Sequence, residues 1–280
     1  MNVLNIIKHG GCLALTVAIM SACNNGAEKK ANADSAKAAA TQNTPGTPIK
    51  YDSSKRYIFL TWDDSPQPPG TVNCKQVFHQ EGVKATFFGV GFNEVGPLKK
   101  RIMDSLRNAY PEFLLANHSF SHGFKNQYSK FYSAAMHDSA LHDFLNNEAL
   151  LKVPVKIIRM PGNNTWAANG EIHGQLSKSK LVHSLDSLGY KIIGWDLEWH
   201  EHNGGKEPQE SVDQLVHEIN QKFDDGATNE QNALVLLSHD RLFQKPQYID
   251  SLRKLVSTLK ADKRNVFETI DHYPMVQRKK

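Results

Sequence analysis

The 280-residue sequence has little cysteine and no strong excess of either charge. Two of its three cysteines, Cys12 and Cys23, lie near the start, so Cys74 has no partner for an internal disulfide in the rest of the chain. The net charge is +4, and lysine and arginine do not cluster with aromatic residues, so nucleic acid is not an expected partner. The fold must therefore be stabilised by its apolar core, with Cys74 as a small buried side chain.

A membrane-spanning run is also missing from the start of the chain, because the apolar segment 12–20 is too short to cross a bilayer as a helix. It matches instead the apolar part of a bacterial secretion signal over residues 1–22. Small residues precede Cys23, an arrangement that resembles the lipobox of bacterial lipoproteins, in which the cysteine is lipidated. This predicts an exported protein of the cell envelope, anchored to a membrane by lipid at Cys23, with a plain cleaved signal as the alternative.

The remaining chain divides by composition into two parts. Residues 23–50 are rich in small and polar residues without apolar periodicity, which predicts a flexible tether. Residues 51–280 alternate short apolar runs with amphipathic segments, as one folded domain does. The expected strands are 57–62, 85–90, 113–116, 155–158, 190–195, 233–237 and 265–270, and the helices between them include 97–108, 177–188, 211–223 and 248–259.

This alternation predicts a parallel α/β fold, either a barrel or an open doubly wound sheet. Polar side chains follow five of the runs, namely Asp63–Asp64, Asn117–His118, Arg159, Asp196 and His239–Asp240. Groups at the carboxyl ends of so many strands converge only when the strands curl into a ring. We therefore expect a barrel built from these seven strands, with its site at that end.

The pair His118 and His122 is the most specific local signal for chemistry. Four residues apart on an expected helical turn, the two imidazoles would lie on one face, as ligands of a divalent metal do. Asp63 or Asp64 would supply a carboxylate, and the two are expected to act differently because consecutive strand residues point to opposite faces. Two histidines, one carboxylate and open positions are typical of a catalytic site for zinc or a similar ion.

Five segments in this order resemble the motifs of the polysaccharide deacetylases, the NodB-like domains of carbohydrate esterase family 4. They are TWDDSP at 61–66, HSFSH at 118–122, RMPG at 159–162, WDLEW at 195–199 and LLSHD at 236–240. The resemblance spans roughly residues 55–271. It implies the distorted (β/α)7 barrel of that family and the removal of acetyl groups from N- or O-acetylated polysaccharide.

The resemblance also implies roles for the polar residues. Asp64, His118 and His122 would bind the metal, typically Zn²⁺, and Asp63 would be the general base for a water molecule that the metal activates. Arg159 would pair with Asp63 and keep it ionised. His239 would be the general acid that protonates the leaving amine or alcohol, oriented by either Asp196 or Glu198.

The same resemblance implies the contacts with substrate. Leu237 would line the pocket of the acetyl methyl group, and Trp195 or Trp199 would wall the sugar groove. The segment Pro161, Gly162 and Asn163 would lie beside the substrate, and the backbone of Gly162 or Asn163 would stabilise the oxyanion. The loops 163–175 and 201–209 would set the choice of polymer.

Two of the motifs depart from the pattern of the family. Ser65 replaces the usual glycine, and its hydroxyl is expected at the mouth of the site. The third motif usually has two prolines, an aromatic residue and a glycine after the arginine, but here the aromatic is missing. Two other functions therefore stay open: a catalytically impaired, tethered carbohydrate-binding protein of the same fold, and a metal-dependent amidase with a non-sugar substrate. No protein partner is predicted.

Overall fold

The computed structural model describes residues 44–204 and 207–279. The expected signal over residues 1–22, Cys23 and most of the tether lie outside this described part. Residues 46–49, at the end of the predicted tether, contact the folded domain: the Gly46 N–H donates to Asp271 Oδ2 at 2.8 Å, and Ile49 packs against buried apolar side chains.

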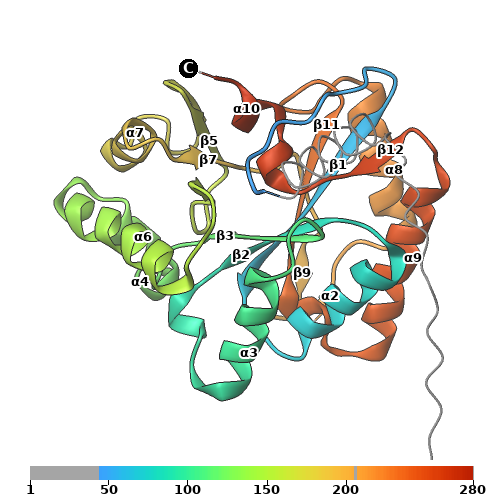
Figure 1. Cartoon of the computed structure of the whole chain (residues 1–280), viewed down its shortest axis with the longest axis horizontal. Coiled ribbons are helices and arrows are strands. Elements are labelled where there is room, and N and C mark those ends of the chain that lie inside the picture. Colours follow the sequence, from blue (N-terminus) through green and yellow to red (C-terminus); the bar gives the residue numbers. More distant parts are fainter. Residues whose placement is uncertain (1–43, 205–206, 280) are drawn as a thin grey trace, which may run out of the picture. The chain divides into compact units, whose positions relative to one another are not determined.

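A ten-stranded, mostly parallel sheet forms the centre of the domain, with the strand order β6-β5-β7-β4-β3-β2-β1-β11-β8 and with β12 paired to β1 (Figure 1). Its strands are β1 (Arg56–Ser65), β2 (Ala85–Gly89), β3 (Phe113–Asn117), β4 (Ile157–Ile158), β5 (Thr165–Ala168), β6 (Glu171–Gly174), β7 (Lys191–Ile192), β8 (Leu197–Glu198), β11 (Ala233–His239) and β12 (Asn265–Phe267). The expected α/β fold is confirmed. The sheet is a curled half-barrel, because β6 and β8 remain as its two ends.

Two segments expected as loops contain short hairpins. Segment 163–175 folds into the antiparallel pair β5 and β6, and β5 also pairs antiparallel with β7. Segment 201–209 contains β9 (Glu201–His202) paired with β10 (Glu207–Pro208). Strands of two to four residues are too short to produce a clear alternation of apolar and polar side chains, so the sequence pattern did not indicate them.

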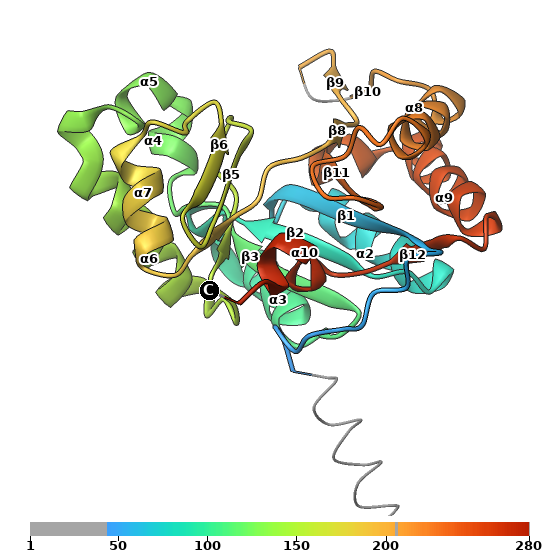
Figure 2. The same cartoon turned by 90° about the horizontal axis from the view of Figure 1, so that it is seen from above.

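Helices cover the convex side of the sheet. Four long ones pack there, and their apolar sides meet the strands in one buried cluster: α2 (Gly70–Glu81), α3 (Gly96–Arg107), α8 (Val212–Asp224) and α9 (Pro246–Ala261). Helix α8 begins where predicted, because the Ser211 hydroxyl caps it by accepting from the Gln214 N–H. Cys74 on α2 is fully buried in this cluster, as expected. Figure 2 shows α8 and α9 side by side beyond β11.

Another helical layer lies at the opposite end of the strand order. Helices α6 (His137–Leu151) and α7 (Lys180–Ser187) contact each other and pack on β4, β5 and β7. The short elements are α4 (His122–Asn126), α5 (Tyr128–Phe131), α10 (Pro274–Gln277), η1 (Gly91–Asn93), η2 (Ala134–Met136), η3 (Asp240–Gln244) and η4 (Ile270–His272). Of the helices in the described ranges, none combines the length and apolarity that crossing a bilayer requires.

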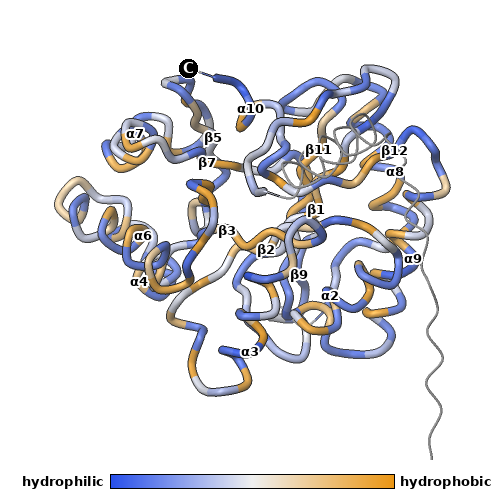
Figure 3. The backbone as a smooth tube through the Cα atoms, viewed as in Figure 1, coloured by the Kyte–Doolittle hydropathy of each residue, from blue (hydrophilic) through white to orange (hydrophobic). Residues whose placement is uncertain are grey.

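The alternation of side chains along β1 positions the polar residues at its end. Ile58, Leu60 and Trp62 face the helices of the convex side, whereas Tyr57 and Phe59 face the concave side, where η4 and α10 cover them. The apolar runs of β2, β3 and β11 are visible as largely orange segments in Figure 3. Because the period is two residues, Thr61 and Asp63 also face the concave side.

Candidate active site

The two neighbouring carboxylates Asp63 and Asp64 reach the same cavity. Asp63 does so by the alternation of β1, and it stands opposite His239 of β11 in the strand register. The pairing of β1 with β2 shifts between Trp62 and Ser65, and Asp64 has a φ of 71°. A bulge of this kind turns a side chain away from the side it would otherwise face. The expectation that the two carboxylates point in opposite directions is therefore wrong, because the strand is irregular at this point.

His118 and His122 lie on the segment after β3 and not on one face of a helix, which corrects the expected helical turn. Residues 118 and 119 have no regular structure, and 122–126 form a turn with positive φ angles. The imidazoles nevertheless converge, with ring centroids 5.0 Å apart. Each ring is fixed by its Nδ1, which contacts the Arg159 carbonyl at 3.0 Å in His118 and the Asn126 side-chain oxygen in His122. Both Nε2 atoms therefore face Asp64.

The side chains of Asp64, His118 and His122 fit a single divalent cation. Asp64 Oδ1 lies 3.1 Å from His122 Nε2 and 3.7 Å from His118 Nε2, and the three ligand atoms lie within 4.8 Å of one another. Ligands bound at about 2.0–2.2 Å from one tetrahedral zinc ion are separated by roughly 3.3 Å. Asp64 Oδ1 is buried without a hydrogen-bond partner among the described residues, a costly state that a cation would relieve.

The protonation states of these groups also suit a cation. Burial lowers the pKa of His118 to about 4, so its imidazole is neutral, which is the form that ligates metals. Burial alone would raise the pKa of Asp64, but His122, His239, His118 and Arg241 around it hold that pKa below its usual value. Asp64 is therefore an ionised carboxylate.

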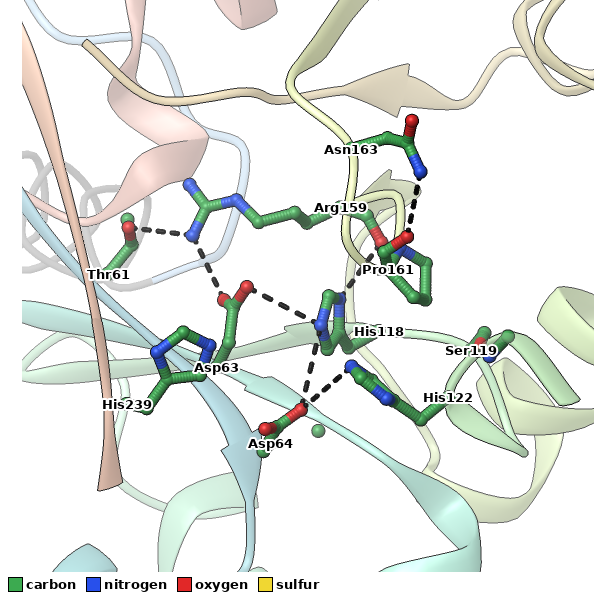
Figure 4. A network of polar contacts seen from close by, with 12 residues as sticks. Thr61, Asp63, Asp64, His118, Ser119, His122, Arg159, Pro161, Asn163 and His239 are labelled. Carbon is green, nitrogen blue, oxygen red and sulfur yellow. Dashed lines mark hydrogen bonds and ion pairs between the residues drawn. The ribbon is translucent and has the colours of Figure 1, made fainter. Parts of the chain in front are cut away.

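Arg159 connects Asp63 to the framework of the sheet. Its side chain is fully buried, and it donates to Asp63 Oδ1 at 2.9 Å and to the Thr61 hydroxyl at 2.8 Å. The carbonyls of Ile193 and Gly194, at 3.2 and 2.8 Å, accept two further N–H groups of the guanidinium. Figure 4 shows Asp63 held between Arg159 and His118, whose Nε2 is 3.4 Å from Asp63 Oδ2. This arrangement fixes one carboxylate oxygen and leaves the other directed toward the metal ligands.

The carboxylate beside His239 belongs to a residue that the sequence did not indicate. Glu201 Oε1 lies 3.2 Å from His239 Nδ1, within ion-pair distance but without the geometry of a hydrogen bond. Neither of the two expected partners has this place: the Asp196 carboxylate accepts from the N–H groups of Asn229 and Val235, where it holds the chain entering β11, and Glu198 lies 3.9 Å from His200. Glu198 does line the cavity, and burial raises its pKa. Glu201 stands on the loop to which we had assigned only the choice of polymer.

Arg241 is a second residue not found from the sequence. Its guanidinium forms ion pairs with Asp64 Oδ2 and with Glu201 Oε2, the latter at 2.6 Å. It therefore joins the carboxylate of the metal site to the partner of His239. Its position directly after His239–Asp240 was the only sequence signal for this role.

A cavity of about 200 Å³ brings most of the predicted site residues together. It is lined by Asp63, Asp64, His118, His122, Tyr128, Met160, Gly162, Trp195, Glu198, Leu237, His239 and Arg241. Trp199, in contrast, is fully buried in the core and donates to the Glu210 carbonyl, so Trp195 is the tryptophan of the cavity. Pro161 and Asn163 flank Gly162 of the cavity, and the Asn163 side-chain N–H donates to the Pro161 carbonyl at 3.2 Å.

Ser65 does not face the cavity mouth as expected. It is fully buried, and its hydroxyl donates to Asp240 Oδ2 at 2.6 Å, as does the Thr71 hydroxyl at 2.5 Å. Its role is to hold the turn between β11 and η3. Ser65 therefore supports the site from behind and does not line either cavity at its mouth.

Comparison with known proteins identifies the type of fold. Residues 50–168 match the family model described as polysaccharide deacetylase, a stretch that contains Asp63, Asp64, His118, His122 and Arg159. No curated protein sequence matches the chain significantly.

Several solved structures resemble the domain. The catalytic domain of peptidoglycan N-acetylglucosamine deacetylase from Eubacterium rectale has 20% identity over 86% of this chain and 98% of its own, with a TM-score of 0.55. The family 4 carbohydrate esterase from Streptomyces lividans, in complex with acetate, has 20% identity over 79% and 95%, with a TM-score of 0.54. A Streptococcus mutans esterase of the same family has 22% identity over 77% and 86%, with a TM-score of 0.55. At these identities the likeness shows that the chain has the NodB-like fold of these enzymes.

Proposed function

We propose that this protein is a metal-dependent hydrolase that removes acetyl groups from N- or O-acetylated polysaccharide. The observation that carries the proposal is the placement of Asp63, which stands between the ligand set and His239 at the end of two adjacent parallel strands. A base and an acid that line one small cavity beside a set of metal ligands are what hydrolysis of an acyl bond requires. The family-model match over residues 50–168 supports the acetylated polysaccharide as substrate class.

Asp64, His118 and His122 would hold the cation, for which we propose Zn²⁺ because two imidazoles and one carboxylate suit it. When bound, this cation polarises the acetyl carbonyl and makes water more acidic. Asp63 then accepts the proton of the attacking water, while Arg159 fixes the direction of the Asp63 carboxylate.

Two further groups complete the reaction. The N–H of Asn163 already donates to the Met160 carbonyl at 3.2 Å, whereas the Gly162 N–H has no acceptor among the described residues and Gly162 lines the cavity. We assign the oxyanion contact to the Gly162 N–H for this reason. His239, with Glu201 at its Nδ1, donates a proton to the departing amine or alcohol as the bond to the acetyl carbon breaks, which releases acetate.

Acetate release from a panel of acetylated glycans, after metal removal and controlled reloading with single divalent ions, tests this function. Asp63→Asn should lower the rate about 10²–10⁴-fold, since the base is lost while the amide keeps the shape. Asp250→Asn, at an exposed position of α9, is the matched control and should leave the rate unchanged.

The same panel separates the remaining functions. Unchanged acetate release by Asp63→Asn would contradict the mechanism. Glycan binding without acetate release under any divalent ion would indicate a carbohydrate-binding protein. Release only from acyl-amino compounds that are not sugars would indicate an amidase.

Export and lipid anchoring at Cys23 form a separate part of the proposal and rest on the sequence alone. The full chain expressed in a bacterial host should partition with membranes, and Cys23→Ser should release it into the soluble envelope fraction. Equal partitioning of the two chains would rule out the lipid anchor.

A further inference from the structure

The ring of Tyr128 lies between two glycines beside the cavity. A Cβ atom added to Gly162 would lie 2.6 Å from Tyr128 Cε2, and one added to Gly123 would lie 2.9 Å from Tyr128 Cδ1. Both distances are shorter than van der Waals contact, so the ring fills the space in which a side chain at either position would lie. Gly162 is the third residue after Arg159, the position at which the third motif of the deacetylases usually has its aromatic residue.

Tyr128 also stands at the junction of two cavities. The inner cavity of about 200 Å³ holds the candidate catalytic residues, and an outer cavity of about 420 Å³ adjoins it. The two share Asp64, His122, Tyr128 and Arg241, and the outer one adds Gln67, Phe92, Asn93 and Lys125. A ligand that occupies both, such as two consecutive sugars, must pass the Tyr128 ring, and sugar rings pack favourably against aromatic faces.

The hydroxyl of Tyr128 has a different contact. It donates to Asn126 Oδ1 at 3.1 Å, and the same oxygen accepts the Nδ1–H of His122. An amide oxygen has two lone pairs and can accept both bonds. Tyr128 therefore supports the Asn126 side chain, which in turn fixes the ring of a proposed metal ligand.

We propose that Tyr128 has two separable roles: its ring, which fills the space beside Gly162, is a wall of the sugar site, and its hydroxyl positions His122 through Asn126. This inference rests on the proposed function for its first role and on the ligand set alone for its second. The ring determines specificity by contact with substrate, and the hydroxyl is a positioning group that touches neither substrate nor metal.

Two variants separate the roles. Tyr128→Phe keeps the ring and loses only the hydroxyl, so we expect weaker Zn²⁺ binding, by roughly tenfold as for other groups behind a metal ligand, with KM unchanged at saturating zinc. Tyr128→Leu also loses the aromatic face, so KM for an acetylated oligosaccharide should rise about tenfold at saturating zinc, with a smaller effect on kcat. Zinc affinity is measured by competition with a chelating dye and does not depend on turnover.

Two further variants serve as controls. Asn126→Leu should reproduce the loss of zinc affinity seen in Tyr128→Phe. Tyr132→Phe should leave zinc affinity unchanged, since the Tyr132 hydroxyl donates to the Pro161 carbonyl at 2.7 Å and has no contact with Asn126.

The contact with Gly162 can be tested by a double-mutant cycle. Gly162→Ala adds a Cβ at φ +65°, which is strained in any background, but the overlap with the ring exists only when Tyr128 is present. Gly162→Ala should therefore destabilise the wild type more than it destabilises Tyr128→Leu.

The outcomes distinguish this inference from the proposed function. If the wild type releases no acetate from any glycan, the proposed function is wrong. The zinc affinities then still test the positioning role of the Tyr128 hydroxyl. Direct glycan binding by the wild type and by Tyr128→Leu still tests whether the ring is a wall of the sugar site. Zinc affinity that Tyr128→Phe does not change would overturn the positioning role. Equal KM or equal glycan binding for the wild type and Tyr128→Leu would contradict the proposed role of the Tyr128 ring as a wall of the sugar site.

Discussion

Three buried carboxylates near the ends of β1 and β11 have different partners. Asp63 accepts from the guanidinium of Arg159, and Asp64 from that of Arg241. Asp240 has only the hydroxyls of Ser65 and Thr71, and its second oxygen has no partner within the described part of the chain. Burial without a nearby cation raises the pKa of Asp240 to about 7.

This pKa predicts a dependence of stability on pH. The pKa of Asp240 is about 7 in the folded state against an ordinary value of 3.8, so the folded state binds the proton more tightly. Its contribution to the free energy of unfolding is fully present below pH ~4 and is lost as pH rises toward 7, with a slope of at most about 1.4 kcal/mol per pH unit. Asp240→Asn, a neutral side chain of the same shape, should remove this slope.

Urea unfolding of the wild type and Asp240→Asn between pH 4 and 7.5 measures the effect. Asp250→Asn, which changes an exposed carboxylate, is the control and should follow the wild type. Parallel stability curves for wild type and Asp240→Asn would show that Asp240 is ionised in the folded protein throughout.

At the scale of single residues, the sequence identified which side chains belong to the site, but it did not identify which of them contact one another. Asp63, Asp64, His118, His122, Arg159 and His239 were found because their spacing resembles known motifs. Glu201 was not, since its contact with His239 joins residues distant in sequence. Asn126 and Tyr128 were not, since their contacts with near neighbours depend on a turn of positive φ angles that the pattern did not indicate. We expected Asp196 or Glu198 beside His239, but Glu201 lies there. Glu201 belongs to the short strand pair β9–β10, which the sequence pattern did not indicate.

Helix α2 and the short helix η3 form the element-scale support of the site. A Cβ added to Gly70, the first residue of α2, would lie 1.9 Å from the carbonyl oxygen of Asp240, the first residue of η3. Because the obstructing atom belongs to the backbone, no side-chain rotation relieves the overlap. The two helices can approach this closely only through a glycine, and η3 in turn carries Arg241 to Asp64.

Gly70→Ala should therefore disturb both the packing of α2 and the site. We expect a loss of about 1–3 kcal/mol in the free energy of unfolding, as for other overpacking changes, together with weaker zinc binding as η3 shifts Arg241. Gly82→Ala, at the opposite end of the same helix, has a φ of +64° and no atom within 4 Å. It should lower stability by about 1–2 kcal/mol through backbone strain and leave zinc affinity unchanged. Equal zinc affinity in the two variants would contradict the proposed coupling between α2 and the site.

The central strands were predictable as elements because each is a continuous apolar run buried on both faces. Phe113–Ala116 and Ala233–Leu237 fall within β3 and β11 for this reason. The turn at 122–126 was not predictable: Phe124, Lys125 and Asn126 all have positive φ, a conformation that non-glycine residues adopt only when their surroundings impose it. A helix was the natural expectation for a four-residue spacing of histidines, and local pattern could not reveal the exception.

At the scale of the whole molecule, the site links elements that are distant in sequence. Asp64 comes from the end of β1, His118 and His122 from the segment after β3, and Arg241 from the start of η3. The concave side beneath them is filled by a separate apolar cluster, which includes Tyr273 packed against Phe59 and Trp166. A cation that binds this ligand set therefore binds the folded state only, because the unfolded chain does not bring the three ligands together.

The midpoint of unfolding should consequently depend on metal. At a free zinc concentration 100 times its Kd, the free energy of unfolding should rise by about 2.7 kcal/mol over the chelated protein, and His118→Gln should lose most of this increase. His217→Gln, at an exposed position of α8, removes an imidazole without touching the ligand set and should respond to zinc as the wild type does. The same stabilisation in His118→Gln and the wild type would place zinc elsewhere on the molecule, and no stabilisation in either would mean that the three side chains, though close, do not bind zinc. Because unfolding is measured without substrate, this result decides the metal centre independently of any reaction that it supports.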